Sequence, residues 1–266
     1  MKIIDFHTHP IYNTNTNKKL GIDFGGDSFV DTLKRAGINM ACGSAIDLPL
    51  MKENKDYAET VRILNERIFA LAKRFPDFII PGIHVQHNAV SESVSEIEKY
   101  SALGLKLVGE LVPNFLGGRT LTEPKAYGAA SFLEPGFMEI FKVCEERELT
   151  LSIHTSTAEE CAELASEFKH LNIVMAHAGP YDTFVKRIAV ASKYDNLYFD
   201  ISGSGTLAAG VLEYAYRNLG REKILFGTDF PGYEPGAFVG IVESANIPDD
   251  SKEYIFHKNA ERLLGL

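Results

Sequence analysis

Short apolar runs alternate along this chain with longer stretches in which apolar residues recur every three or four positions. The clearest of these stretches places Tyr57, Val61, Leu64, Ile68 and Leu71 at such steps, which is typical of a helix with one buried side. The short runs predict strands. They begin at residues 3–10 and continue at residues 38–46, 78–85, 103–110, 149–154, 172–177, 196–201 and 223–229.

A helix is predicted after each run, so that a strand-helix unit repeats along the whole chain. Two helical stretches follow the last strand, and the final one starts near residues 249–251 and ends before Gly265. No linker or shift in composition divides the run. The pattern therefore predicts an α/β fold with a single domain over residues 1–266. We expect a parallel eight-stranded barrel ringed by helices, the (β/α)8 or TIM barrel, with an additional C-terminal helix.

Four of the apolar runs end in a histidine or an aspartate. The first ends in His7 and His9, which leave the same face of an alternating strand about 7 Å apart. Later runs end in His154, His177 and Asp229. In a parallel barrel the carboxyl ends of the strands share one rim, and active sites are built there. We therefore expect a site for a divalent metal ion at this rim. The alternative is four separately satisfied buried polar residues.

The same alternation assigns faces to the neighbouring residues. Asp5 is expected on the face of His7, one step deeper, where it orders the core. Phe6 and Thr228 are expected to face the helices.

Composition restricts the classes of function. A chain of 266 residues with 45% hydrophobic content can bury a large core. The cysteines, Cys42, Cys144 and Cys161, show no paired spacing, which favours a reducing compartment over a disulfide framework. No apolar stretch suits a signal peptide or a membrane span, so we expect a cytoplasmic protein without membrane contact. The formal charge of −9 opposes nucleic acid as a partner. A small-molecule substrate is expected, and the oligomeric state stays open, a homo-oligomer included.

The rim residues together carry a resemblance to a known family. His-x-His on the first strand, single histidines on the fifth and sixth, and an aspartate on the eighth resemble the ligand pattern of the amidohydrolase superfamily. Residues 258–266 (KNAERLLGL) are similar to the close of its amidohydrolase-related branch. The likeness spans the whole chain. It implies a divalent metal, usually zinc, and hydrolysis or, in some members of this branch, non-oxidative decarboxylation.

Roles for the rim residues follow from this resemblance. His7, His9 and Asp229 would hold the metal, and Asp229 would act as general base on a bound water whose pKa the metal lowers toward about 7. His154 and His177 would bind a second metal ion. With only one ion, they would be a ligand and a proton donor to the substrate.

The fourth strand carries two candidates for a further ligand. Members of the superfamily with two metals use a carboxylated lysine or a glutamate here, and both Lys106 and Glu110 point to the same face by parity. Counted from the start of each strand, Glu110 lies at the depth of the other rim residues, whereas Lys106 lies about 13 Å lower. We therefore predict Glu110 as the ligand. The alternatives are that Glu110 pairs with Arg119 and that Lys106 neutralises a buried carboxylate.

Residues 111–135 form the longest irregular stretch, and loops of that length are usually functional. Arg119 within it is predicted to bind the carboxylate of an anionic substrate, the alternative being a solvated arginine. His84, after the third strand, is predicted to orient the substrate, or else is an ordinary loop histidine. Asp200 is expected either to hydrogen-bond a ligand histidine or to cap the turn at Ser202.

Three functions remain in competition. A metal-dependent hydrolase of a small amide, lactone or ester, with Asp229 as general base, is the first choice. The alternative is a decarboxylase of an aromatic or unsaturated acid, with His177 as the proton donor. A binding protein that holds a metal without catalysis is disfavoured because Asp229 is a proton acceptor at the site. The substrate itself is not encoded in any motif.

Overall fold

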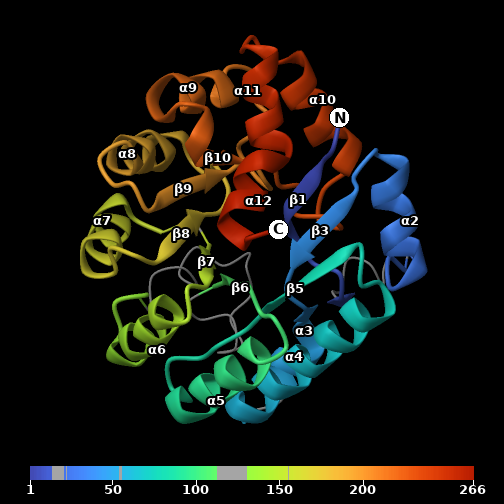
Figure 1. The fold of residues 1–266 in the computed structure, drawn as a ribbon, viewed down its shortest axis with the longest axis vertical. Helices are drawn as coiled ribbons and strands as arrows, with labels where there is room; N and C mark the ends of the chain where they lie inside the picture. Colours follow the sequence, from blue (N-terminus) through green and yellow to red (C-terminus); the bar gives the residue numbers. More distant parts are fainter. Residues whose placement is uncertain (14–20, 22, 54–55, 113–130, 155) are drawn as a thin grey trace.

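The computed structural model describes residues 1–13, 21, 23–53, 56–112, 131–154 and 156–266. These residues contain eight parallel strands in the order β1-β3-β5-β6-β7-β8-β9-β10, arranged around a barrel (Figure 1). The first and last strands close it, because the Phe6 amide donates to the Phe226 carbonyl at 2.9 Å and the His9 amide to the Phe230 carbonyl at 2.8 Å. The predicted (β/α)8 barrel is confirmed. The strands are β1 Ile4–Thr8, β3 Met40–Gly43, β5 Ile79–Ile83, β6 Leu107–Leu111, β7 Thr150–Ile153, β8 Asn172–Met175, β9 Leu197–Asp200 and β10 Ile224–Leu225.

Helices form the outer ring (Figure 1). The longest, α4 Tyr57–Arg74, begins where the Asp56 side chain accepts a hydrogen bond from the Glu59 amide, and it buries Val61, Leu64 and Ile68 against the strands. The periodic apolar positions thus cover the barrel, as predicted. Further helices around the barrel are α2 Asp27–Arg35, α5 Val90–Ser101, α6 Pro135–Glu146, α7 Ala158–Glu167, α8 Tyr181–Ala191, α9 Val211–Leu219, α10 Pro235–Ser244 and α11 Asp249–Glu253. The chain ends in α12 Asn259–Leu264.

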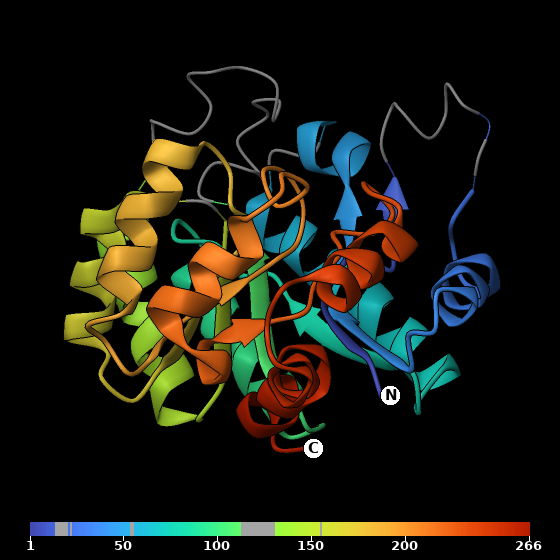
Figure 2. The same cartoon turned by 90° about the horizontal axis from the view of Figure 1, so that it is seen from above.

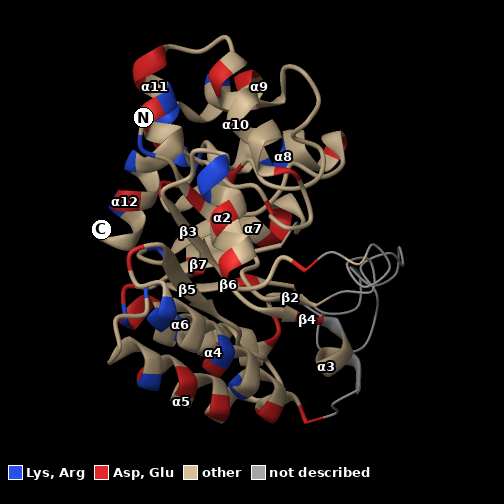
Figure 3. Ribbon diagram, turned by 90° about the vertical axis from the view of Figure 1, so that its right-hand side faces the viewer, with Lys and Arg blue, Asp and Glu red and all other residues tan. Residues whose placement is uncertain are grey.

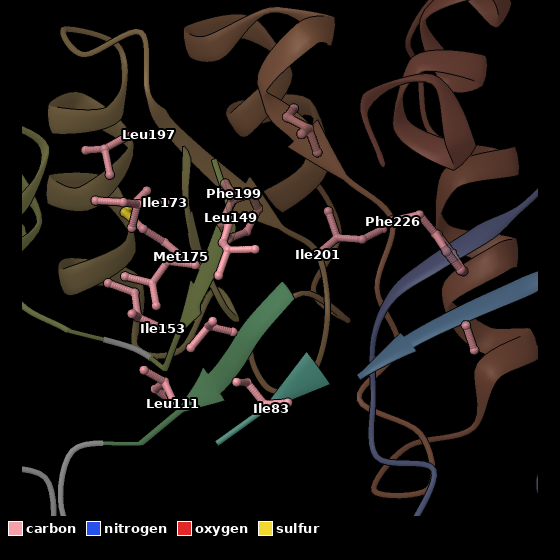
Figure 4. Packing of buried hydrophobic residues seen from close by; sticks show 14 of the residues in the cluster. Ile83, Leu111, Leu149, Ile153, Ile173, Met175, Leu197, Phe199, Ile201 and Phe226 are labelled. Carbon is pink, nitrogen blue, oxygen red and sulfur yellow. The ribbon is translucent and has the colours of Figure 1, made fainter. Parts of the chain in front are cut away.

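The apolar core consists of two layers. An inner cluster collects side chains from strands all around the barrel and from α12. The α12 helix closes the amino end of the barrel, where the Thr150 hydroxyl at the start of β7 donates to the Leu263 carbonyl at 3.0 Å (Figure 2). An outer layer fills the space between strands and helices, and Figure 4 shows Ile173, Met175, Leu197 and Phe199 in it. The inner cluster is Ile4, Phe6, Cys42, Leu107, Val174, Tyr198, Leu225, Ala260, Leu263 and Leu264.

Strand β1 departs from simple alternation just before its histidines. Its register with β3 shifts between Asp5 and Thr8. Phe6 consequently lies in the inner cluster, whereas Asp5 pairs with Ala41 of the outer layer. The predictions that Phe6 faces the helices and that Asp5 shares the face of His7 are wrong, because an irregularity of this kind puts the alternation out of step.

The segments after the first two strands are more ordered than the sequence indicates. The predicted strand at residues 38–46 is shorter, and a two-residue strand, β4 Ile46–Asp47, pairs instead with β2 Tyr12–Asn13. The predicted polar loop at residues 47–56 contains the helix α3 Leu48–Glu53. These elements lie at the end of the barrel opposite α12 (Figure 2). Most of the long irregular stretch, with Arg119, lies outside the described residues.

Charged side chains of both signs are interspersed on the outer helices. Figure 3 shows Lys and Arg next to Asp and Glu on α4, α5 and α6 rather than in a single basic surface. None of the helices in the described part of the chain combines the length and the apolarity needed to cross a membrane.

Candidate metal centre

Polar side chains from the carboxyl ends of the strands converge at one rim of the barrel. They come from β1, β6 and β9 and from the segments that follow β1, β7, β8 and β10. All are buried except His154 and Asp229, which are partly exposed. Of the predicted metal ligands, every one lies in this cluster. The cluster is His7, His9, Glu110, His154, His177, Asp200 and Asp229.

Glu110 lies in the middle of the cluster. Its Oε1 atom is 2.6 Å from His154 Nδ1 and 3.1 Å from His177 Nε2. Its Oε2 atom is 3.4 Å from His7 Nε2 and 3.7 Å from His9 Nε2. Each carboxylate oxygen therefore faces one pair of imidazoles.

The outward ring nitrogens of three histidines have fixed partners. His7 Nδ1 lies 2.9 Å from Asp200 Oδ2, and His9 Nδ1 lies 3.3 Å from the Ser44 carbonyl oxygen. His177 Nδ1 lies 2.9 Å from the Ser202 hydroxyl, which itself donates to Asp200 Oδ1. Because all three partners accept, the Nδ1 atoms carry the hydrogens, and the Nε2 lone pairs of the neutral rings point into the cluster.

This arrangement fits a divalent metal ion. Within the described residues, His7 Nε2 is buried and has no hydrogen-bond partner. It lies opposite a carboxylate oxygen of Glu110, and His9 Nε2 lies 3.1 Å from Asp229 Oδ1. Lone pairs that face one another in this way repel unless a proton or a cation lies between them. Neutral imidazoles with carboxylates are the donors that zinc and manganese take in proteins.

The donor atoms group into sets of three that each approach within 4.8 Å of one another. One set is His7, His9 and Asp229, and a second is Glu110, His154 and His177. A third set adds Asp200 to His7 and His177. The first set consists of the residues predicted to hold a metal ion, and the second contains His154 and His177, which were predicted to bind a second ion.

The ionisable groups of the cluster shift one another's pKa. Burial alone would lower the pKa of His7, but the Asp200 and Glu110 carboxylates raise it well above its usual value. Burial likewise opposes a raised pKa of His177, which the Glu110 carboxylate nevertheless produces. Burial would raise the pKa of Glu110, but the surrounding imidazoles, His154 first, hold it well below its ordinary range. Without a metal the cluster therefore retains protons that a cation would displace.

Two of the rim residues adopt a left-handed backbone conformation. His177 has φ of 59° and Asp229 has φ of 61°, which costs a residue other than glycine roughly 1–2 kcal/mol. Arg187 of α8 is buried and holds the turn at His177, because its guanidinium donates to the carbonyls of Ala176, His177 and Ala178 at 3.2, 2.6 and 2.7 Å. Arg187 of α8 thus holds His177 in its strained backbone conformation.

Asp5 ties β1 to the loop that carries Asp229. Its carboxylate accepts hydrogen bonds from the Thr228 hydroxyl at 2.6 Å, the Thr228 amide at 3.1 Å and the His7 amide at 3.2 Å. Burial raises the pKa of Asp5 to about 7. Asp5 therefore supports the cluster from beside it rather than contributing a ligand.

The remaining candidates from the sequence are placed differently. His84 is buried near the rim, with its Nε2 atom 2.6 Å from the Ala45 carbonyl oxygen, and burial lowers its pKa to about 4. Lys106 is exposed at the other end of the barrel, where a Cβ on Gly265 would lie 3.8 Å from its Nζ atom. Asp200 does both things that were expected of it, since it binds His7 and also accepts from the Ser202 amide at 2.9 Å.

Sequence reasoning missed Ser202 and Arg187. Arg187 had a signal, because it occupies a buried position of α8 between Phe184 and Ile188, where a charge needs a specific partner. Ser202 had only its place two residues after Asp200, which was read as a turn to be capped rather than as a contact for a ring.

The fold and the rim define a class: a (β/α)8 barrel with a candidate divalent-metal centre at the carboxyl ends of its strands. The chain belongs to the amidohydrolase family, since the family profile described as Amidohydrolase matches residues 4–266. Among curated proteins, none matches the chain.

Several solved structures share this fold over nearly their whole length. The 2,6-dihydroxybenzoate decarboxylase from Rhizobium superposes with a TM-score of 0.77 at 16% identity, covering 100% of this chain and 99% of its own. A dihydroxybenzoic acid decarboxylase from Polaromonas sp. JS666, with bound manganese and the inhibitor 2-nitroresorcinol, gives 0.75 at 15% identity, covering 100% and 97%. The 5-carboxyvanillate decarboxylase from Novosphingobium aromaticivorans, with manganese and 4-hydroxy-3-methoxy-5-nitrobenzoic acid, gives 0.72 at 14%, covering 100% and 96%. At these identities the likeness shows the fold.

Proposed function

We propose that this protein is a metal-dependent, non-oxidative decarboxylase of a small aromatic acid that carries a hydroxyl group beside its carboxylate. The observation that carries the proposal is the convergence of the Nε2 atoms of His7, His9 and His177 on the carboxylates of Glu110 and Asp229. The decarboxylases whose barrels match this one from end to end favour this reaction over the hydrolysis expected first from the sequence.

The cluster contains groups for holding a substrate and for moving a proton. His7, His9 and Asp229 would hold the ion, together with His154 or Glu110, and His177 would add its Nε2 atom to the ligands while its ring is neutral. A bound divalent cation would supply positive charge for the carboxylate and hydroxyl oxygens of the substrate. The Asp229 and His154 side chains are 20% and 14% exposed, whereas that of Glu110 is 5% exposed, so the first two face the open side of the rim.

Decarboxylation requires one proton at the ring carbon. The bond between that carbon and the carboxylate breaks, CO2 leaves, and the electron pair that remains on the carbon takes a proton. His177 is the proposed donor, because its Nδ1 atom is held by Ser202 while its Nε2 atom faces the centre of the cluster. The acid form of His177 is regained from solvent after each turnover.

Hydrolysis remains the second candidate, and Asp229 favours it. Burial would raise the pKa of Asp229, but its contact with His9 and the nearby imidazoles lower it. The carboxylate is therefore in its basic form at neutral pH, as a general base for attack by water requires.

One experiment separates the two reactions. The protein, loaded with Mn²⁺, is incubated with hydroxybenzoates, lactones and amides in ¹⁸O-labelled water, while CO2 release and label uptake are followed. We expect CO2 release from an ortho-hydroxylated acid with no label in the organic product, and a deuterium at the former carboxylate carbon when D2O replaces water. Label in the product without CO2 would establish hydrolysis instead.

Two variants assign the proton transfer. His177→Asn should lower kcat for CO2 release by about 10²- to 10⁴-fold, the usual contribution of a general acid. His170→Asn, which changes an exposed histidine remote from the rim, should leave kcat unchanged. Equal rates for the wild type and His177→Asn would remove His177 from the reaction.

A further inference from the structure

We propose that Ser202 is a positioning residue that fixes the ring orientation and the tautomer of His177, and through it the affinity of the rim for its metal ion. The inference deepens the proposed function and depends on the metal centre assigned there. Ser202 itself would touch neither the metal nor the substrate.

The Ser202 hydroxyl lies where three members of the cluster meet. It follows β9, is fully buried, and donates to Asp200 Oδ1. Its oxygen lies 2.9 Å from His177 Nδ1 and 3.1 Å from His7 Nδ1. One hydroxyl therefore contacts both His177, which faces Glu110 Oε1, and His7, which faces Glu110 Oε2.

The proton count of these contacts fixes the direction of each bond. A serine hydroxyl has one hydrogen and two lone pairs. The hydrogen goes to the Asp200 carboxylate, which can only accept. The oxygen must then accept from the ring nitrogens, so that His177 carries its hydrogen on Nδ1 and presents a lone pair on Nε2 when the ring is neutral.

The loop leaves the rings little freedom to avoid this contact. The Ser202 amide donates to Asp200 Oδ1 at 2.9 Å, which anchors the backbone. A Cβ on the next residue, Gly203, would lie 2.3 Å from His177 Nδ1, so the loop backbone packs directly against the imidazole. Any side chain at position 203 would therefore collide with the ring of His177.

The two histidines depend on Ser202 to different degrees. His7 Nδ1 has a second acceptor, Asp200 Oδ2, at 2.9 Å. In the described part of the chain, the side-chain acceptor of His177 Nδ1 is Ser202. Removal of the hydroxyl should therefore release His177 while His7 stays in place, and this asymmetry distinguishes positioning from a general loss of packing.

The first test observes the rings directly. In long-range ¹H–¹⁵N spectra of the Zn²⁺-loaded wild type, His177 should carry its hydrogen on Nδ1, with slow exchange of that hydrogen against solvent. Ser202→Ala should accelerate this exchange at least tenfold for His177 and leave His7 nearly unchanged. A wild-type His177 with a hydrogen on Nε2 and none on Nδ1 overturns the inference without any variant, as does equal behaviour of both rings in Ser202→Ala.

The second test measures binding of the metal alone. We expect the Zn²⁺ dissociation constant of Ser202→Ala to rise about 10- to 100-fold, the usual effect of losing a group that orients a ligand. Ser251→Ala is the matched control, because Ser251 is equally buried and its hydroxyl lies 3.2 Å from the Tyr216 hydroxyl, far from the rim. An unchanged constant in Ser202→Ala, or an equal change in both variants, would contradict a positioning role.

Neither test uses a substrate. If the rings and the metal respond as expected but no acid loses CO2, the proposed reaction fails and the role of Ser202 stands. If CO2 is released but Ser202→Ala leaves rings and affinity unchanged, the reaction stands and the role of Ser202 fails.

Discussion

At the scale of single residues, Glu110 occupies the position from which we expect it to determine how many ions the rim binds. Its two oxygens face different pairs of imidazoles, so one carboxylate serves both groups of ligands. We expect Glu110→Gln to lower the number of divalent ions per chain, because the amide keeps the shape but loses the charge. Lys106→Met should leave the number unchanged, since Lys106 is exposed at the opposite end. Elemental analysis of both variants decides this, and a lower count in Lys106→Met would identify the lysine as the ligand.

The choice between these two residues shows what a sequence can settle at this scale. Counting depth along each strand was enough to place Glu110 with the histidines, because parallel strands in a barrel end at a common rim. Phe6 could not be placed in the same way, since its direction depends on a register shift that has no signature in the sequence. Ser202 could not be predicted for a related reason, because its histidine partners lie on β1 and in the loop after β8, which are distant from it in sequence.

At the scale of elements, the repeated strand-helix pattern predicted the strands and their order. It did not predict the short elements in the segments that connect them. Helix α3 lies in a stretch that reads as a polar loop, and β2 and β4 are too short to produce an alternating pattern. Such short elements depend on contacts with the barrel rather than on their own residues. The rim could be predicted because it is fixed by strand ends, which are the best determined parts of the pattern.

The link between α8 and the loop after β8 gives a prediction about stability. Arg187→Met should lower the free energy of unfolding of the metal-free protein by about 3 kcal/mol, because three carbonyls lose a charged donor. The measurement is chemical denaturation. Arg62→Met is the control, since Arg62 forms an exposed pair with Glu66 on α4 and should cost less than about 1 kcal/mol. Equal losses in the two variants would show that Arg187 does not hold the His177 turn.

At the scale of the whole molecule, the barrel carries two distinct ends. The amino end is closed by α12 and an apolar inner cluster, whereas the carboxyl end holds a set of buried carboxylates and imidazoles that shift one another's pKa. The free energy of unfolding should therefore depend on whether protons or a metal ion lie between these carboxylates and imidazoles.

The stability of the molecule should therefore depend on metal and pH together. The pKa values of His7 and His177 are raised above 6.5, so the stabilisation that their protons give to the metal-free protein is complete below that pH and is lost as pH rises through the raised values. Glu110 and Asp229 have lowered pKa values and stay ionised over this range. A metal ion binds the same imidazoles only when they are deprotonated, so metal binding becomes stronger as the pH rises.

We expect the melting temperature of the Mn²⁺-loaded protein to exceed that of the chelator-treated protein by roughly 5 to 10 °C near neutral pH. The gap should widen as the pH rises above 6.5, because the metal-free form loses its protons while the loaded form does not rely on them. Differential scanning fluorimetry at matched ionic strength measures both forms. Asp5, whose pKa burial raises to about 7, also titrates in this range, so its contribution enters both curves. A gap that stays constant or narrows as the pH rises would show that the metal does not take the place of the protons between these histidines and carboxylates.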